Sequence, residues 1–148
     1  MSDAAWEITH SEETDASPDF AWNYWTNIAN WDDPPAKFQL DGPFAAGSYG
    51  TTRLPGQEAL RWLIREVVPP SLATIELQLE GAVLAFEWRF DRLGDQRARI
   101  TQRVALRGEN AATLRSQVES TFKSNLPEGM KKLARAITDA EKKTKNVG

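Results

Sequence analysis

The sequence predicts an α+β fold in which a curved antiparallel sheet of six to seven strands surrounds a long C-terminal helix. Two observations predict it. Stretches of alternating apolar and polar residues, separated by glycine and proline turns, fill the middle of the chain, and a long run with helical spacing ends it. Alternation gives each strand one apolar and one polar face, which is typical of an antiparallel sheet buried on one side. The 148 residues fit a single domain, 1–148.

The N-terminal part begins with a strand from Trp6 to Glu13, which would place His10 on its inward face. A helix is expected from Pro18 to Asn30, because Ser17 can cap its free N–H groups and proline suits the first helical position. The proline pair Pro34-Pro35 would stop this helix. Its buried stripe is expected to contain Ala21, Trp22, Trp25, Ile28 and Trp31.

Five further strands are predicted between turn residues. They are Ser48–Leu54, Ala59–Val68, Leu72–Leu79, Val83–Leu93 and Arg97–Arg107. The inward faces of the last four carry mainly large apolar residues, whereas the outward faces carry charges whose sign alternates from strand to strand. Such alternation favours cross-strand ion pairs.

The C-terminal helix is expected from Ala112 to Lys143. Its apolar residues follow one another at steps of three or four, so one face should be buried from end to end. Pro127 removes a backbone hydrogen bond within this helix, and Gly129 follows it. We therefore expect a kink at Pro127 that could act as a hinge.

The composition excludes several classes of protein. A net charge of −3 and a pI of about 5.3 argue against a nucleic-acid-binding protein. The absence of cysteine and the single histidine leave no conventional zinc site, and neither a metal nor a cofactor is expected. No secretory signal and no apolar stretch long enough for stable membrane insertion is visible. The default expectation is a cytoplasmic monomer or homodimer.

The predicted fold implies a pocket. A helix with its side chains is about 10–12 Å wide, and a sheet of six or seven strands spaced ~4.8 Å apart is wider. The C-terminal helix therefore cannot cover the concave face alone. Either bulky side chains fill the remaining space, for which the six tryptophans are suited, or a cavity remains.

Four segments together resemble the SRPBCC superfamily, which includes START domains, birch-pollen-allergen-like proteins and polyketide cyclase/dehydrase-like proteins. They are Ser17-Pro18-Asp19-Phe20-Ala21-Trp22 through Trp31, Gly47-Ser48-Tyr49-Gly50, Trp62 through Pro70, and Trp88-Arg89-Phe90 through Val104. The resemblance covers nearly the whole chain in the right order. It implies the helix-grip fold, with two short helices after the first strand, and a hydrophobic cavity. It implies no particular reaction, because the superfamily contains binders, transporters, cyclases and co-chaperones.

Most candidate ligand-binding residues are large and apolar, and for each of them plain core packing is an alternative with at least as much support from the sequence. These are Trp25, Trp62, Phe86, Trp88, Phe90, Phe122 and Met130. Two polar candidates accompany them. Gln102, between Ile100 and Val104, could orient a polar ligand group or satisfy a helix carbonyl. Tyr49 could offer a hydroxyl group, but the sequence does not determine on which face of the sheet it lies.

His10 and Glu66 are the weak candidates for catalysis. His10 could act as an acid or base near neutral pH, or simply hydrogen-bond to backbone or water near a sheet end. Glu66 would share a face with Trp62 and Ile64 and could move a proton there, or it could reach solvent at the strand end.

Three functions remain open. The first is binding of a small, mostly hydrophobic molecule such as a lipid, polyketide or aromatic metabolite, since such cavities combine many apolar groups with few polar ones. The second is a polyketide cyclase/dehydratase-like enzyme that would use His10 with Glu66. The third is a protein–protein module, such as a co-chaperone or a ribosome-associated factor, which predicts a filled cavity and an exposed apolar patch.

Overall fold

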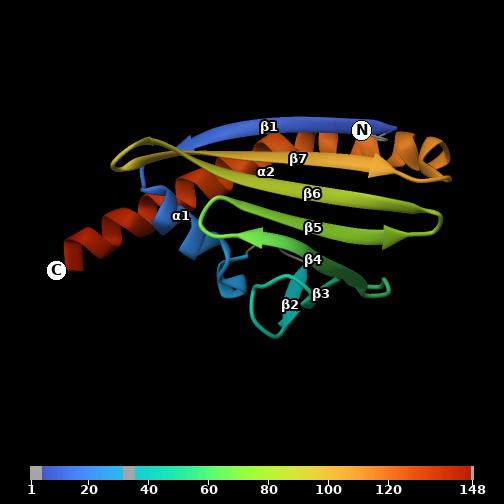
Figure 1. The fold of residues 1–148 in the computed structure, drawn as a ribbon, viewed down its shortest axis with the longest axis horizontal. Helices are drawn as coiled ribbons and strands as arrows, with labels where there is room; N and C mark the ends of the chain where they lie inside the picture. The colour runs from blue at the N-terminus through green and yellow to red at the C-terminus, as the bar shows by residue number, and fades with distance from the viewer. Residues whose placement is uncertain (1–4, 32–35, 148) are drawn as a thin grey trace.

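All seven strands of the computed structural model, which describes residues 5–31 and 36–147, belong to one sheet in the order β1-β7-β6-β5-β4-β3-β2 (Figure 1). Every neighbouring pair is antiparallel. The strands are β1 (Trp6–Thr14), β2 (Lys37–Asp41), β3 (Tyr49–Arg53), β4 (Leu60–Val68), β5 (Leu72–Leu79), β6 (Ala82–Gly94) and β7 (Arg97–Arg107). The predicted fold class is confirmed.

The short edge strand β2 is missing from the sequence prediction. It pairs with β3 and places Phe38 and Leu40 toward the inner face of the sheet. With only two apolar residues in five positions, and with turn residues on its C-terminal side, its alternation is too short to be distinguished from a loop.

The first helical segment divides into two short helices. Helix α1 (Pro18–Trp25) begins as predicted, with the Ser17 hydroxyl accepting a hydrogen bond from the Phe20 backbone N–H at 3.1 Å. It ends five residues early, and a 3₁₀ turn, η1 (Ile28–Asn30), follows. The prediction of one helix to Asn30 is wrong because Asn27 takes an extended conformation and caps η1 with its side chain. The predicted stop at Pro34-Pro35 lies outside the described residues.

The long helix α2 (Ala111–Val147) lies across the concave side of the sheet (Figure 1). It packs mainly along β1, with smaller contacts to β7 and α1. Near its C-terminal half, the Thr14 hydroxyl donates to the Ala134 carbonyl at 2.8 Å and fixes the helix to β1. The helix continues through Pro127 as one element, and the expected kink there stays a prediction. Because α2 lies along one side of the sheet, the inner faces of the central strands need other cover.

The outer face of the sheet carries the predicted ion pairs. Glu7 of β1 pairs with Arg103 of β7, and Glu76 of β5 lies between Arg65 of β4 and Arg107 of β7, each 2.8 Å away. Burial raises the pKa of Glu76, but the hydrogen bonds and positive charges of Arg107 and Arg65 outweigh burial and lower it overall. None of the helices in the described part of the chain is long and apolar enough to span a membrane.

Candidate functional site

A ladder of four indoles covers the part of the sheet that α2 leaves open. Trp88 lies 4.7 Å from Trp25 between ring centroids, Trp25 stacks on Trp31 at 6.1 Å, and Trp31 stacks on Trp62 at 5.5 Å. The Trp31 indole N–H also donates to the Trp25 carbonyl at 2.6 Å, which satisfies an acceptor left free at the end of α1. The ladder therefore ties α1 and η1 to β6 and β4.

A cavity of about 800 Å³ remains between this ladder, the inner faces of β6 and β7, and α2. Its apolar lining combines aromatic and aliphatic side chains from the N-terminal segment, from β6 and from α2. They are Trp25, Trp31, Phe38, Phe86, Trp88, Phe122, Leu126, Met130, Leu133 and Ala136. Phe86 and Phe122 close one part of it with an edge-to-face contact at 5.7 Å.

Gln102 is the buried polar group of this cavity. It lies on the inner face of β7, opposite Trp88 of β6, and is only 7% exposed. No protein group among the described residues forms a hydrogen bond with its side chain. Since no fully enclosed side-chain nitrogen or oxygen in this part of the chain lacks a partner, the Gln102 amide must open onto the cavity. An amide that opens onto the cavity without a protein partner leaves its donor and acceptor groups available to a ligand.

Half-buried and exposed side chains form the mouth of the cavity. On α2, the exposed lining residues are Asn125, Glu128, Gly129 and Lys132. The polar and aromatic residues Tyr24, Asn30 and Phe38, which line the cavity from α1, η1 and β2, are half-buried. The Asn30 amide donates to the Tyr24 carbonyl at 2.9 Å, which holds η1 against α1 at this point.

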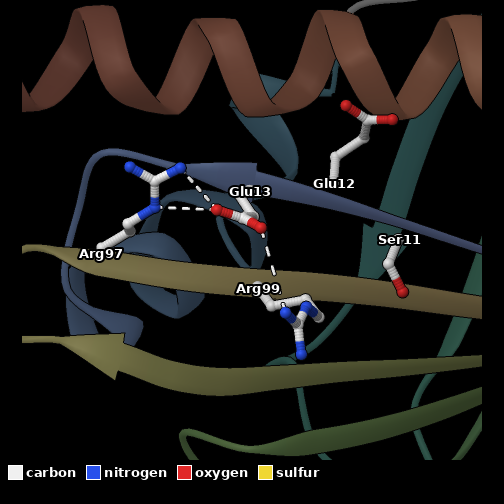
Figure 2. A pocket seen from close by; sticks show the side chains of 5 residues that line it. All are labelled: Ser11, Glu12, Glu13, Arg97 and Arg99. Carbon is white, nitrogen blue, oxygen red and sulfur yellow. Dashed lines mark hydrogen bonds and ion pairs between the residues drawn. The ribbon is translucent and has the colours of Figure 1, made fainter.

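A second hollow, of about 380 Å³, lies over the strand ends of β1 and β7 and is charged instead of apolar. Glu13 lies between Arg97 and Arg99, whereas Glu12 points toward α2 on the other side of β1 (Figure 2). Arg97 donates to Glu13 at 2.5 Å, and Arg99 lies 3.9 Å from it. The hydrogen bond to Glu13 raises the pKa of Arg97. Because these exposed arginines already share a carboxylate, the hollow is a weak candidate for a site.

The described residues form no cluster of His, Cys, Asp or Glu suited to a metal. Within residues 5–31 and 36–147, no three His, Cys, Asp or Glu side chains lie close enough together to hold an ion.

A match to a protein-family sequence model identifies the family of this chain. The model described as "Polyketide cyclase / dehydrase and lipid transport" matches residues 5–138. The chain belongs to this family. The match confirms the resemblance to the SRPBCC superfamily. No curated protein sequence matches the chain.

Solved structures share the fold of this member of the polyketide cyclase / dehydrase and lipid transport family at low sequence identity. The Zhui aromatase/cyclase from Streptomyces sp. R1128 has a TM-score of 0.71 and 14% identity, covering 89% of this chain and 93% of its own. Norcoclaurine synthase from Thalictrum flavum, in complex with dopamine and hydroxybenzaldehyde, has a TM-score of 0.69 and 15% identity, covering 93% and 87%. TTHA0849 from Thermus thermophilus has a TM-score of 0.66 and 13% identity, covering 90% and 98%.

Six of the nine residues predicted to bind ligand line the cavity of this family member. They are Trp25, Phe86, Trp88, Gln102, Phe122 and Met130. Their contact with a ligand stays a prediction. Trp62 and Phe90 lie behind this lining in the core, where Trp62 donates to the Thr52 hydroxyl at 3.0 Å and Phe90 packs on Trp22 at 5.4 Å.

Tyr49 and Glu66 lie on the outer face of the sheet, away from the cavity. Tyr49, whose facing the sequence leaves open, pairs with Leu63, and the Arg61 guanidinium lies 3.9 Å above its ring. The prediction of Glu66 beside Trp62 and Ile64 is wrong, because the register shifts between Ile64 and Glu66 and places Glu66 opposite Thr74. One extra residue in a bulge reverses the facing of everything after it.

His10 is inward-facing as predicted, but it does not line the cavity. Its Nε2 atom contacts the Glu12 carboxylate at 2.5 Å, and both side chains are about a quarter exposed. The pair that the enzyme hypothesis requires, His10 with Glu66, is not assembled, since the two residues lie on opposite faces of the sheet.

The sequence pattern does not identify several of the residues that line the cavity. Trp31 belongs to the predicted buried stripe, but its position in the cavity wall depends on the turn after α1. Phe38 belongs to the strand that was not predicted. Tyr24, Asn30, Asn125 and Lys132 are polar residues of helices or turns, and no pattern in the sequence distinguishes them from solvated positions.

Proposed function

We propose that this protein binds a small, mostly apolar, ring-bearing molecule in the cavity between the sheet and α2. One observation carries the proposal: the cavity is lined by aromatic side chains and contains one buried amide, Gln102, that has no partner in the described part of the chain. An oxygen or N–H group on the ligand would complete the hydrogen bonding of Gln102 and thereby fix the orientation of the molecule.

The size and chemistry of the cavity support this proposal. Its volume of about 800 Å³ falls within the range of sites for small organic molecules. Ligand-binding cavities typically combine an apolar lining with few polar groups, and this one follows that pattern. The family description names polyketide cyclases and lipid transport, and a similar structure holds dopamine and hydroxybenzaldehyde. Aromatic rings matching the indole walls are therefore the first ligands to test.

The two other functions have less support. A cyclase or dehydratase needs a proton-transfer pair at the cavity, and His10 with Glu66 does not provide one. A protein–protein module predicts a filled cavity, whereas the described residues leave about 800 Å³ open. Binding without an assigned reaction is the function best supported.

The test compares 2-naphthol with naphthalene, which has the same ring system but no hydroxyl group. The wild-type protein should bind 2-naphthol more tightly, by about two- to tenfold, because one net hydrogen bond is worth about 0.5–1.5 kcal/mol. Gln102→Leu should remove this difference and leave the affinity for naphthalene within about twofold. Dissociation constants from isothermal titration, with native mass spectrometry for stoichiometry, would measure both effects.

The matched control is Gln39→Leu, which makes the same change at an exposed position of β2. It should bind both compounds like the wild type. The proposal is overturned if the wild type binds neither compound, and its assignment of Gln102 is wrong if Gln102→Leu still prefers 2-naphthol.

A further inference from the structure

Helix α2 presents two adjacent stripes, and Leu126 and Met130 of the first stripe also line the cavity. Leu126, Met130, Ala134 and Ile137 are buried against the sheet. Phe122, Gly129, Leu133 and Ala136 form the neighbouring stripe, at steps of seven, four and three residues, and all four line the cavity. The residues before and after Gly129 in this stripe direct their side chains toward the cavity, whereas Gly129 has no side chain there.

Neither backbone conformation nor packing requires a glycine at this position. Gly129 lies inside a helix and does not have a positive φ. A Cβ atom built on it would meet nothing within 4 Å. Gly50 is different, since a Cβ there would lie 2.1 Å from the Trp62 ring. A glycine within a helix is less stable than an alanine would be. Since neither conformation nor packing accounts for Gly129, its effect on the open space beside it is the remaining explanation.

That space belongs to the mouth of the cavity. Gly129 is exposed and lies between Asn125 and Lys132 on the α2 side of the mouth. Tyr24, Asn30 and Phe38 line the same cavity from α1, η1 and β2, and they are half-buried. A side chain at position 129 would therefore extend into open space at the exposed edge of the cavity without disturbing the core.

Building on the proposed function, we infer that Gly129 sets the width of the mouth and so limits the size of the molecule that can pass into the cavity. Gln102, deeper in the site, selects for a hydrogen-bonding group. Gly129 selects by cross-section before that group is reached. The two selections are separable, because one acts on the rate of association and the other on the stability of the bound state.

The test measures association rates of two probes that share one hydroxyl group and differ in ring number: 2-naphthol and 1-hydroxypyrene. Stopped-flow fluorescence would follow each probe with the wild type, Gly129→Ala and Gly129→Leu. Alanine and leucine have similar helix propensities, so the step from alanine to leucine isolates side-chain volume from helix stiffness. Ser124→Leu, at an exposed position that does not line the cavity, is the matched control.

Gly129→Leu should lower the association rate constant of 1-hydroxypyrene by about tenfold or more and that of 2-naphthol by less than about twofold. Gly129→Ala should have an intermediate effect on 1-hydroxypyrene, and Ser124→Leu none. Unchanged rates for both probes, or equal losses for both, would overturn the inference while leaving the proposed function intact. If the wild type binds neither probe, the proposed function fails and the inference fails with it.

Discussion

At the scale of single residues, a glycine can determine the packing of a neighbouring ring because it has no side chain. Gly50 of β3 lies directly opposite Trp62 of β4, and the indole ring passes over it. In this position Trp62 stacks on Trp31 and donates to Thr52. Pairing a glycine with an aromatic residue across two strands thus anchors one end of the indole ladder.

Gly50→Ala should destabilise the protein by about 1–3 kcal/mol, because the new methyl group would displace the Trp62 ring from its packed position. Urea unfolding followed by circular dichroism would measure the change in the free energy of unfolding. Gly129→Ala is the control, and it should stabilise the protein by up to about 1 kcal/mol, since its Cβ meets no neighbour. A Gly50→Ala variant as stable as the wild type would show that the indole ring moves at no cost.

Residue positions on regular strands were predictable, and those after an irregularity were not. The period of two placed Phe86, Trp88 and Gln102 on the inner face, as the structure confirms. It failed at Glu66, because nothing in the sequence around Arg65 indicates the bulge that reverses the facing of the strand. The role of Gln102 could be stated only as alternatives, since a lone amide on an apolar strand face is equally compatible with a protein partner.

At the scale of elements, the outer face of the sheet is held across strands by charge. The Glu76 carboxylate of β5 accepts hydrogen bonds from Arg65 of β4 and from Arg107 of β7, so it reaches over the intervening strand β6. The Glu76 side chain is only 12% exposed, whereas both arginines are more open to solvent. A single carboxylate thereby joins three strands.

Glu76→Gln should reduce the free energy of unfolding at pH 7 by about 1–2 kcal/mol, through weaker hydrogen bonds to both arginines. The lowered pKa of Glu76 fixes the pH dependence: its stabilising contribution is complete above the unfolded-state value of about 4.3 and is lost as the pH falls through the folded-state value. The difference between wild type and variant should therefore shrink below pH 4. Urea titrations at several pH values would test this, with Glu58→Gln in an exposed loop as the control. A constant difference at all pH values would contradict it.

Element existence was predicted better than element boundaries. The long strands and α2 follow from sustained periodicity, which a few irregular residues do not disguise. The split between α1 and η1 depends on whether Asn27 caps a new turn or continues the old one, and both choices are locally acceptable. This split decides where Trp31 lies, so an error of a few residues in an element conceals a wall of the cavity.

At the scale of the whole molecule, the cavity results from the difference in width between one helix and a seven-stranded sheet. That difference was predictable from element counts alone. How much of the space side chains fill was not, because it depends on how α1, η1 and β2 fold over the central strands. In the structure the indoles fill part of the space, and a cavity of about 800 Å³ remains.

Ligand binding should stabilise the whole fold, because the cavity exists only when the sheet, α1 and α2 are assembled. At a free 2-naphthol concentration of 100 times Kd, linkage predicts about 2.7 kcal/mol of stabilisation, and for a chain of this size each kcal/mol raises Tm by about 2–4 °C. Differential scanning calorimetry would measure the shift. Gln102→Leu at the same ligand concentration should show a smaller one. A wild type that binds 2-naphthol without any rise in Tm would indicate binding to the unfolded chain as well.

The indole ladder also has an optical consequence. Trp88, Trp25, Trp31 and Trp62 follow one another at centroid distances of 4.7, 6.1 and 5.5 Å. At such distances the excited states of neighbouring indoles couple, and excitation passes from ring to ring before emission. The near-ultraviolet dichroism of these four rings, and of Trp22 at 5.8 Å from Trp25, should therefore depend on the joint placement of α1, η1, β4 and β6 as well as on the surroundings of each tryptophan.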